Sequence, residues 1–179
     1  MGNPFDDLKH EHEAIRFSLR ILAVMVERAR AGRLDGVDAL AVVNFLKEFA
    51  DKCHHGKEEG ILFPELEKAG IPNAGGPIGA MLHEHELGRG HIRDMEAALR
   101  KHPANFAAFA RAAEAYGGLL DQHIEKENSV LFPMGERVID ERKRGAIFER
   151  FEEHEEKVIG AGRHEELHAM LDRFEKKYL

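Results

Sequence analysis

Two stretches of the sequence place a histidine and a glutamate at the same spacing before the same three residues. Residues 53–64 read Cys-His-His-Gly-Lys-Glu-Glu-Gly-Ile-Leu-Phe-Pro, and residues 122–133 read Gln-His-Ile-Glu-Lys-Glu-Asn-Ser-Val-Leu-Phe-Pro. Aligned on Leu-Phe-Pro, the copies match His54 with His123 and Glu58 with Glu127. Residues four apart lie on one face of a helix. Each copy therefore predicts a histidine and a carboxylate that share one metal ion or bind two adjacent ions.

The first copy contains two histidines at this spacing from a glutamate. His55 precedes Glu59 by four residues, as His54 precedes Glu58. Either pair could bind a metal. The register of the repeat favours His54, because it is His54 that aligns with His123.

A shorter repeat adds a second pair of histidines. Residues 10–16 and 83–89 both read His-Glu-His-Glu-x-x-Arg, which matches His12 with His85. The first histidine of each copy lies two residues earlier, about 200° around a helix. We expect that histidine to face away from the site, or to lie just outside the ligands.

The spacing of apolar residues predicts an all-α protein. Long amphipathic helices joined by short loops favour an up-down-up-down four-helix bundle, with additional C-terminal helices packed on its outside. The expected domains are a bundle at residues 1–135 and a C-terminal helical extension at residues 136–179. Pro64 is expected to kink the second helix or to stand in the first turn of a restarted one. The expected helices are residues 4–31, about 36–68, 78–101, 104–131, 139–157 and 164–178.

A bundle of this kind would bring the repeated residues together in its core. Metal sites in helix bundles are built from side chains on facing helices, and histidine with carboxylate but no thiolate suits Fe, Mn or Zn. Two metal ions fit better than one, because six ligands divide equally between two. Glu11, Glu59 and Glu84 could orient the imidazoles. The predicted metal ligands are His12, His54, Glu58, His85, His123 and Glu127.

Composition narrows the class of protein. The formal net charge of −7, with interspersed Lys and Arg, argues against a nucleic-acid partner. No apolar run approaches the ~20 residues of a membrane-spanning helix, so no membrane partner is expected, and no secretory signal is visible at the N-terminus. The single cysteine excludes an intrachain disulfide and suits a reducing compartment. We therefore expect a cytoplasmic protein; its oligomeric state stays open.

The motifs resemble the hemerythrin-like family, also called HHE cation-binding proteins. The resemblance covers roughly residues 5–135 and implies a non-heme centre of two iron ions, bridged by an oxo or hydroxo group and both glutamates, with Zn or Mn as alternatives. The residues that carry it are Glu11-His12, His54-x-x-x-Glu58-Glu59, Glu84-His85 and His123-x-x-x-Glu127, with Leu-Phe-Pro after the second and fourth motifs.

One part of the family pattern is missing. Oxygen-carrying hemerythrins use five histidines and two carboxylates, with a His-x-x-x-His pair on the third helix. Here the positions four residues from His85 are Met81 and Arg89. The resemblance therefore points away from simple reversible oxygen storage and towards the hemerythrin-like proteins that sense or handle iron, oxygen, nitric oxide or peroxide.

Three functional hypotheses follow. The first is a module that binds or senses O2, NO or peroxide. The second is a redox enzyme that decomposes peroxide or NO or activates oxygen, with Tyr116 as the one catalytic candidate, although such a tyrosine is more often a core residue. The third is binding of iron or another divalent metal alone. Cys53 could be a redox-sensitive thiol or a small buried residue. The remaining histidines are expected at the surface or in packing: His91, His102, His154, His164 and His168.

Overall fold

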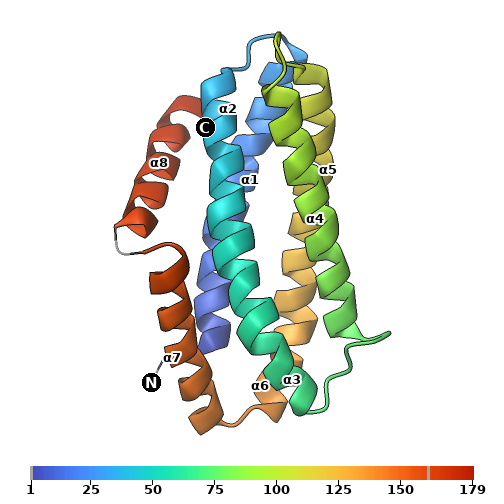
Figure 1. The fold of residues 1–179 in the computed structure, drawn as a ribbon, viewed down its shortest axis with the longest axis vertical. Helices are drawn as coiled ribbons and strands as arrows, with labels where there is room; N and C mark the ends of the chain where they lie inside the picture. The colour runs from blue at the N-terminus through green and yellow to red at the C-terminus, as the bar shows by residue number, and fades with distance from the viewer. Residues whose placement is uncertain (1, 161) are drawn as a thin grey trace.

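The computed structural model describes residues 2–160 and 162–179, and within them the regular structure is entirely helical (Figure 1). The prediction of an all-α protein is confirmed. Four long helical rods carry most of the chain. The first is α1 (Pro4–Arg30) and the third is α4 (Pro77–Leu99). The second joins α2 (Gly36–Phe45), η1 (Leu46–His55), η2 (Glu58–Leu62) and α3 (Phe63–Lys68), and the fourth joins α5 (Phe106–Lys126), η3 (Glu127–Leu131) and α6 (Phe132–Val138).

Several of the helices begin where a short polar side chain accepts hydrogen bonds from free backbone N–H groups. The Asn3 side chain accepts from the N–H of Phe5, and Asp35 accepts from the N–H groups of Val37 and Asp38. The helices of the C-terminal segment are α7 (Glu141–Val158) and α8 (Arg163–Tyr178). Most of these bounds lie close to those expected from the sequence, but the fourth rod continues through α6 to Val138, beyond the expected end at residue 131.

The second and fourth rods each contain π-helical turns just before their Leu-Phe-Pro motif. The N–H of Phe63 donates to the carbonyl of Glu58, five residues earlier, and the N–H of Phe132 donates to that of Glu127. Each proline follows in the first turn of a restarted α-helix. Proline has no N–H group and cannot donate the i→i−4 hydrogen bond of an α-helix. A wider π-helical turn before the proline reduces the disruption of the helix that this missing donor would cause. The repeat is therefore visible in the backbone as well as in the side chains.

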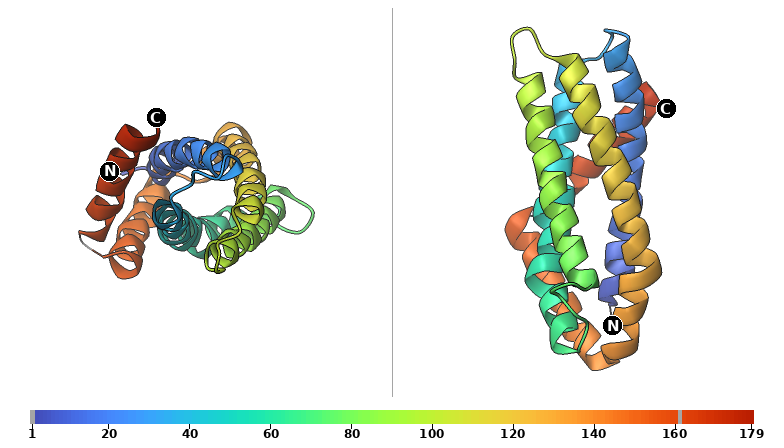
Figure 2. Two further views of the ribbon diagram at one scale, coloured as in Figure 1. Left: turned by 90° about the horizontal axis from the view of Figure 1, so that it is seen from above. Right: turned by 90° about the vertical axis from the view of Figure 1, so that its right-hand side faces the viewer.

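The rods lie side by side, and successive rods run in opposite directions (Figures 1 and 2). α1 packs against α2 and α5, and α4 packs against α2 and α5. α7 and α8 lie outside this group and contact α1. Within the described residues no helix has both the length and the apolar character needed to cross a membrane.

The apolar core is divided into two clusters by a layer of buried polar side chains. Leu8 belongs to the cluster at one end of the rods and Ile15 to the cluster at the other end, and His12 lies between them on α1. The other rods repeat this order, with Met81 and Ile92 on either side of His85. The two clusters thus enclose the polar layer from both ends.

Candidate metal centre

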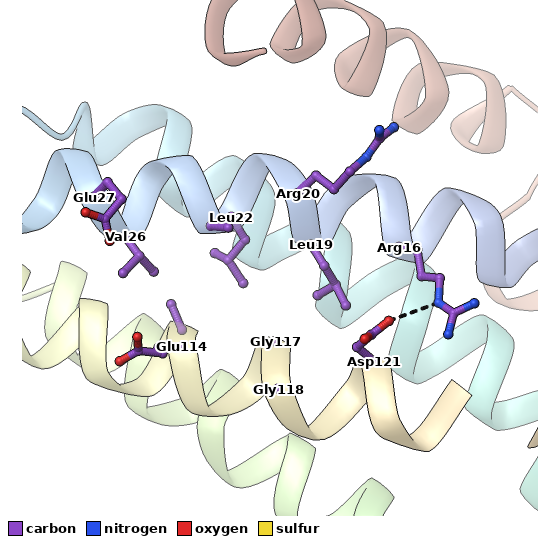
Figure 3. Close-up of a pocket in the computed structure, with 12 residues that line it drawn as sticks. Arg16, Leu19, Arg20, Leu22, Val26, Glu27, Glu114, Gly117, Gly118 and Asp121 are labelled. Carbon is purple, nitrogen blue, oxygen red and sulfur yellow. Dashed lines mark hydrogen bonds and ion pairs between the residues drawn. The ribbon is translucent and has the colours of Figure 1, made fainter. Parts of the chain in front are cut away.

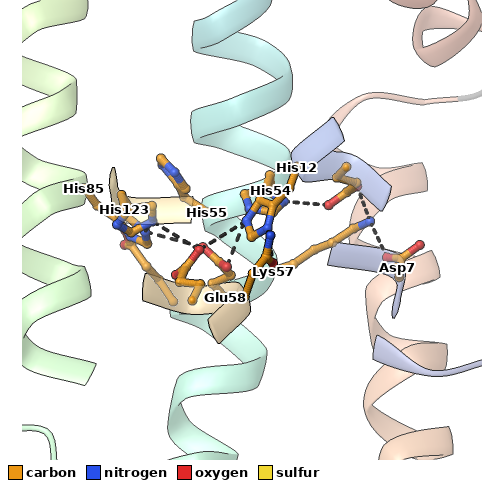
Figure 4. A network of polar contacts seen from close by, with 12 residues as sticks. Asp7, His12, His54, His55, Lys57, Glu58, His85 and His123 are labelled. Carbon is orange, nitrogen blue, oxygen red and sulfur yellow. Dashed lines mark hydrogen bonds and ion pairs between the residues drawn. The ribbon is translucent and has the colours of Figure 1, made fainter. Parts of the chain in front are cut away.

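The polar layer contains five histidines and two glutamates, here called the His/Glu cluster. All seven side chains are buried, and none is more than 3% exposed. Figure 4 shows most of them converging from the four rods. The six ligands predicted from the sequence all belong to the cluster, and His55 is the seventh member.

The cluster has two halves, each able to offer one ligand atom per residue within 4.8 Å of the others. One half consists of His12, His54, Glu58 and Glu127. In the other half the Nε2 atoms of His85 and His123 lie 3.1 Å apart. Two nitrogens each about 2.1 Å from one metal ion are separated by about 3 Å when they meet it at a right angle. This half consists of His55, Glu58, His85 and His123.

Both glutamates connect the halves. Oε1 of Glu58 lies 3.5 Å from Nε2 of His54, while its Oε2 lies 3.4 Å from Nε2 of His85. Oε2 of Glu127 lies 3.2 Å from Nε2 of His12 and 3.3 Å from Nε2 of His123. A carboxylate that faces two groups of nitrogens is suited to bridge two cations.

The cluster leaves polar atoms without partners. A buried polar atom that makes no hydrogen bond is costly, and native proteins contain few of them. Among the described residues, seven of the eight such side-chain atoms belong to the cluster, and the eighth is the hydroxyl of Tyr116. Nitrogen and carboxylate donors around one buried space are the donors that Fe, Mn and Zn accept. The residues therefore fit a pair of such ions.

Three of the imidazoles are held by carboxylates on their outer nitrogens. Nδ1 of His54 donates to Glu11 at 2.8 Å, Nδ1 of His85 donates to Glu59 at 2.7 Å, and Nδ1 of His123 donates to Glu84 at 3.0 Å. Because carboxylate oxygens only accept, the Nδ1 atoms must carry the protons. The inner Nε2 atoms are then available as metal ligands. Glu11, Glu59 and Glu84 are the three residues that the sequence suggested for this role.

Two further orienting groups were not anticipated from the sequence. Nδ1 of His12 lies 2.8 Å from Oδ1 of Asn128. Nδ1 of His55 lies 3.5 Å from Oδ1 of Asp51, one turn earlier in the same rod. The latter spacing was a usable signal, since Asp51 and His55 are four residues apart, like the repeated His and Glu pairs.

Burial and mutual charge set the pKa values in the metal-free cluster. Burial and then the Glu127 carboxylate raise the pKa of Glu58. Burial also raises the pKa of Glu127, but His123 and His12 outweigh it and hold that pKa well below the usual range. Burial lowers the pKa of His55 to about 4, which keeps its imidazole neutral, as a metal ligand must be.

The sequence favoured His54 over His55, but the structure places both side chains in the cluster, so which of them binds metal stays a prediction. In an α-helix consecutive side chains are about 100° apart, so one of two adjacent histidines would turn away. η1 ends at His55, and its π-turns hold more residues per turn. Consecutive side chains then lie closer together around the axis. The His55 ring stacks on that of His85, with centroids 3.8 Å apart, which places it in the second half of the cluster.

A scan of protein families matches residues 3–135 to the hemerythrin HHE cation binding domain. The chain belongs to the hemerythrin family. The match spans the four rods and all members of the His/Glu cluster, and it ends before α7. Searches of curated proteins and of solved structures returned no match. The hemerythrin domain supports metal binding, while the individual ligands and the expected domain boundaries at residues 135 and 136 stay predictions.

Other predicted residues lie outside the cluster. Tyr116 is a core residue, packed close to Gly88, and its catalytic role stays a prediction. Cys53 is fully buried, and burial followed by the Glu11 carboxylate raises the pKa of its thiol to about 12. The thiol is therefore protonated at neutral pH, which favours a small buried residue. His10 and His83 are exposed, as expected.

A groove between α1 and α5 is separate from the His/Glu cluster (Figure 3). Its volume is about 500 Å³, and none of its lining residues belongs to the cluster. Gly117 and Gly118 line it on α5, and a hydrogen bond from Arg16 to Asp121 lies at one end. The groove and the His/Glu cluster therefore share no residues.

Proposed function

We propose that this hemerythrin domain holds two iron ions and binds or senses O2, NO or peroxide there. The proposed ligands are the seven members of the His/Glu cluster. The observation that carries the proposal is the placement of Glu58, whose two oxygens face histidines in different halves of the cluster. One carboxylate shared by two ligand groups favours two adjacent ions. Zinc or manganese would suit the same donors.

The proposal includes the up-down-up-down four-helix bundle expected from the sequence. It is supported by the alternating direction of the rods and by their packing order, in which α1 and α4 each contact α2 and α5. Ligands from facing helices meet in the centre of such a bundle.

The presence of His55 in the cluster changes the number of histidine donors, which affects the function that the site supports. The sequence suggested four histidines, one fewer than oxygen-carrying hemerythrins use. With His55 the set becomes five histidines and two carboxylates. The fifth histidine comes from the second rod instead of the third. The donor count therefore supports binding of a small molecule at an open position on reduced iron, with redox turnover of peroxide or NO as the alternative.

The test is to purify the protein without oxygen and measure metal per chain. The reduced protein is then exposed to O2, NO or hydrogen peroxide, and the optical spectrum is followed. A reversible spectral change with two irons per chain supports binding or sensing, and repeated turnover of peroxide or NO supports the enzyme. His12→Ala should lose metal, whereas His10→Ala, an exposed site on the same helix, should not. A chain that holds only zinc, or no metal, would contradict the di-iron proposal.

A further inference from the structure

Helix α7 lies outside the segment that matches the hemerythrin family, yet one of its faces meets the turn that carries two of the proposed ligands. His154 and Glu155 follow Phe151 by three and four residues, so both lie on the same side of the helix as Phe151. All three contact residues 52–57 of the second rod. The segment between these contacts contains His54 and His55.

The first contact is made through a buried lysine. Lys57 is 1% exposed, and its Nζ lies 2.8 Å from Glu155, 2.7 Å from Glu11 and 3.1 Å from Asp7. It also lies 5.6 Å from the centre of the Phe151 ring. A lysine ammonium has three N–H donors and no acceptor, and here each donor has a carboxylate. Figure 4 shows this side chain extending from the second rod towards Asp7.

The lysine joins α7 to a proposed ligand. Glu11 accepts from Lys57 through Oε1 and from Nδ1 of His54 through Oε2, at 2.7 and 2.8 Å. A continuous series of hydrogen bonds therefore runs from Glu155 through Lys57 and Glu11 to His54. Every group between the two ends is nearly or completely buried. In such surroundings, moving one carboxylate displaces the groups bonded to it, because water cannot replace the lost partner.

The second contact is made by His154. Its Nε2 donates to the backbone carbonyl of Lys52 at 3.2 Å, within the π-helical segment. Gly56 lies against the same imidazole, and a Cβ atom there would come within 2.7 Å of Nε2. α7 therefore holds the turn on both sides of His54 and His55, at Lys52 and at Lys57.

We propose that α7 is a positioning element of the metal centre, in which Glu155 and His154 hold the 52–57 turn and thereby orient His54. This inference rests on the proposed function, since it assigns α7 a role in the same centre. Glu155 and His154 are positioning residues that touch neither metal nor ligand. The C-terminal extension would then position the metal centre as well as pack on the outside of the rods.

A first experiment needs no metal. Glu155→Gln keeps the shape of the side chain and removes its charge, and Glu156→Gln makes the same change at an exposed neighbour on α7. In the metal-free protein, Glu155→Gln should speed amide hydrogen exchange at residues 53–58 and shift the Nδ1–H signal of His54 in imidazole NMR spectra. The signal of His85 is an internal control, because the Glu59 carboxylate that holds it is hydrogen-bonded to His85 and to Arg89 on α4.

Equal shifts at His54 and His85 would indicate general loosening and would overturn the proposal. So would equal spectra and exchange rates in the Glu155→Gln and Glu156→Gln variants. These measurements decide the role of α7 even if the wild-type protein proves to bind no metal, so a failure of the proposed function remains distinguishable.

A second experiment measures Zn²⁺ affinity by competition with a chelator. Loss of a group that orients a metal ligand weakens metal binding about 10-fold to 100-fold, and we expect about 10-fold for Glu155→Gln with no change for Glu156→Gln. Gly56→Ala should also weaken binding, because the methyl group meets His154. Adding His154→Ala should restore part of that loss if it is transmitted through α7. Unchanged affinity in Glu155→Gln, or no restoration in the double variant, would overturn the proposal.

Discussion

His54 and His55 are consecutive in the chain, yet their imidazoles lie in different halves of the buried cluster. Nε2 of His54 faces Glu58 at 3.5 Å, whereas the His55 ring stacks on His85 with centroids 3.8 Å apart. The backbone there is π-helical, a conformation found frequently at functional sites. One short segment of the second rod therefore supplies a nitrogen to each half.

This arrangement predicts that a substitution in one half of the cluster reduces metal binding in that half more than in the other. His55→Ala removes one nitrogen from the half that contains His85 and His123 and leaves the other half complete. We expect metal content to fall from two ions towards one per chain, measured by elemental analysis after chelator washing. His91→Ala on α4, outside the cluster, is the control. Two tightly held ions in His55→Ala would remove His55 from the ligand set.

The helices and most of the cluster could be predicted because their signals are local. Apolar spacing defines the helices, and the duplicated motif places His54, Glu58, His123 and Glu127 in register. Glu11, Glu59 and Glu84 were suggested by their position beside the histidines, and each accepts from an imidazole on another rod.

The remaining features depend on backbone geometry and on contacts between distant segments. An α-helical reading turns His55 away from His54, whereas the segment is π-helical and both imidazoles lie in the cluster. The contact between His12 and Asn128 spans 116 residues, and that between Lys57 and Glu155 spans 98. No local sequence pattern predicts such pairs, because they form only when distant helices pack together.

Glu58 is expected to stabilise the metal-bound protein and to destabilise the metal-free one. Its folded pKa is raised by burial and by Glu127, so the folded state favours the protonated carboxyl. Glu58 therefore lowers the free energy of unfolding of the metal-free protein increasingly as pH rises above the ordinary pKa of a glutamate. The loss is complete above the raised pKa. Glu58→Gln carries no such charge, and we expect the metal-free variant to be more stable than wild type by about 1–3 kcal/mol at pH 8.

Urea denaturation of chelator-treated protein at pH 4 and pH 8 measures this difference. The advantage of Glu58→Gln should shrink at pH 4, where the wild-type carboxyl is protonated. The same variant should lose both metal ions, because Glu58 contacts both halves of the cluster. Glu125→Gln, at an exposed position on α5, controls for charge. Lower stability of Glu58→Gln at pH 8 would contradict the assignment of Glu58 as a buried, unfavourably placed charge.

Asn128 is expected to affect the affinity and the reduction potential of one metal ion, because it orients His12. The other orienting groups are carboxylates, whereas His12 is held by a neutral amide. Asn128→Ala should weaken metal binding about 10-fold to 100-fold, measured by chelator competition, while Ser129→Ala, at an adjacent exposed residue, should not. Asn128→Asp should make the imidazole more basic and shift the reduction potential of the iron pair to more negative values in spectroelectrochemical titration. A potential that does not move would show that His12 is not a ligand.

Two helical glycines should respond oppositely to the same added methyl group. A Cβ at Gly135 on α6 would lie 2.7 Å from Phe5 and 2.8 Å from Leu66, so Gly135→Ala must displace packed core side chains. We expect a loss of about 1–3 kcal/mol in the free energy of unfolding. A Cβ at Gly117 on α5 meets nothing within 4 Å and would project into the groove beside α1. Gly117→Ala should therefore gain up to about 1 kcal/mol from helix propensity alone. Urea denaturation of both variants measures the two changes in the free energy of unfolding. A stabilising Gly135→Ala would mean that α6 does not pack against α1 and α3 as closely as these distances require.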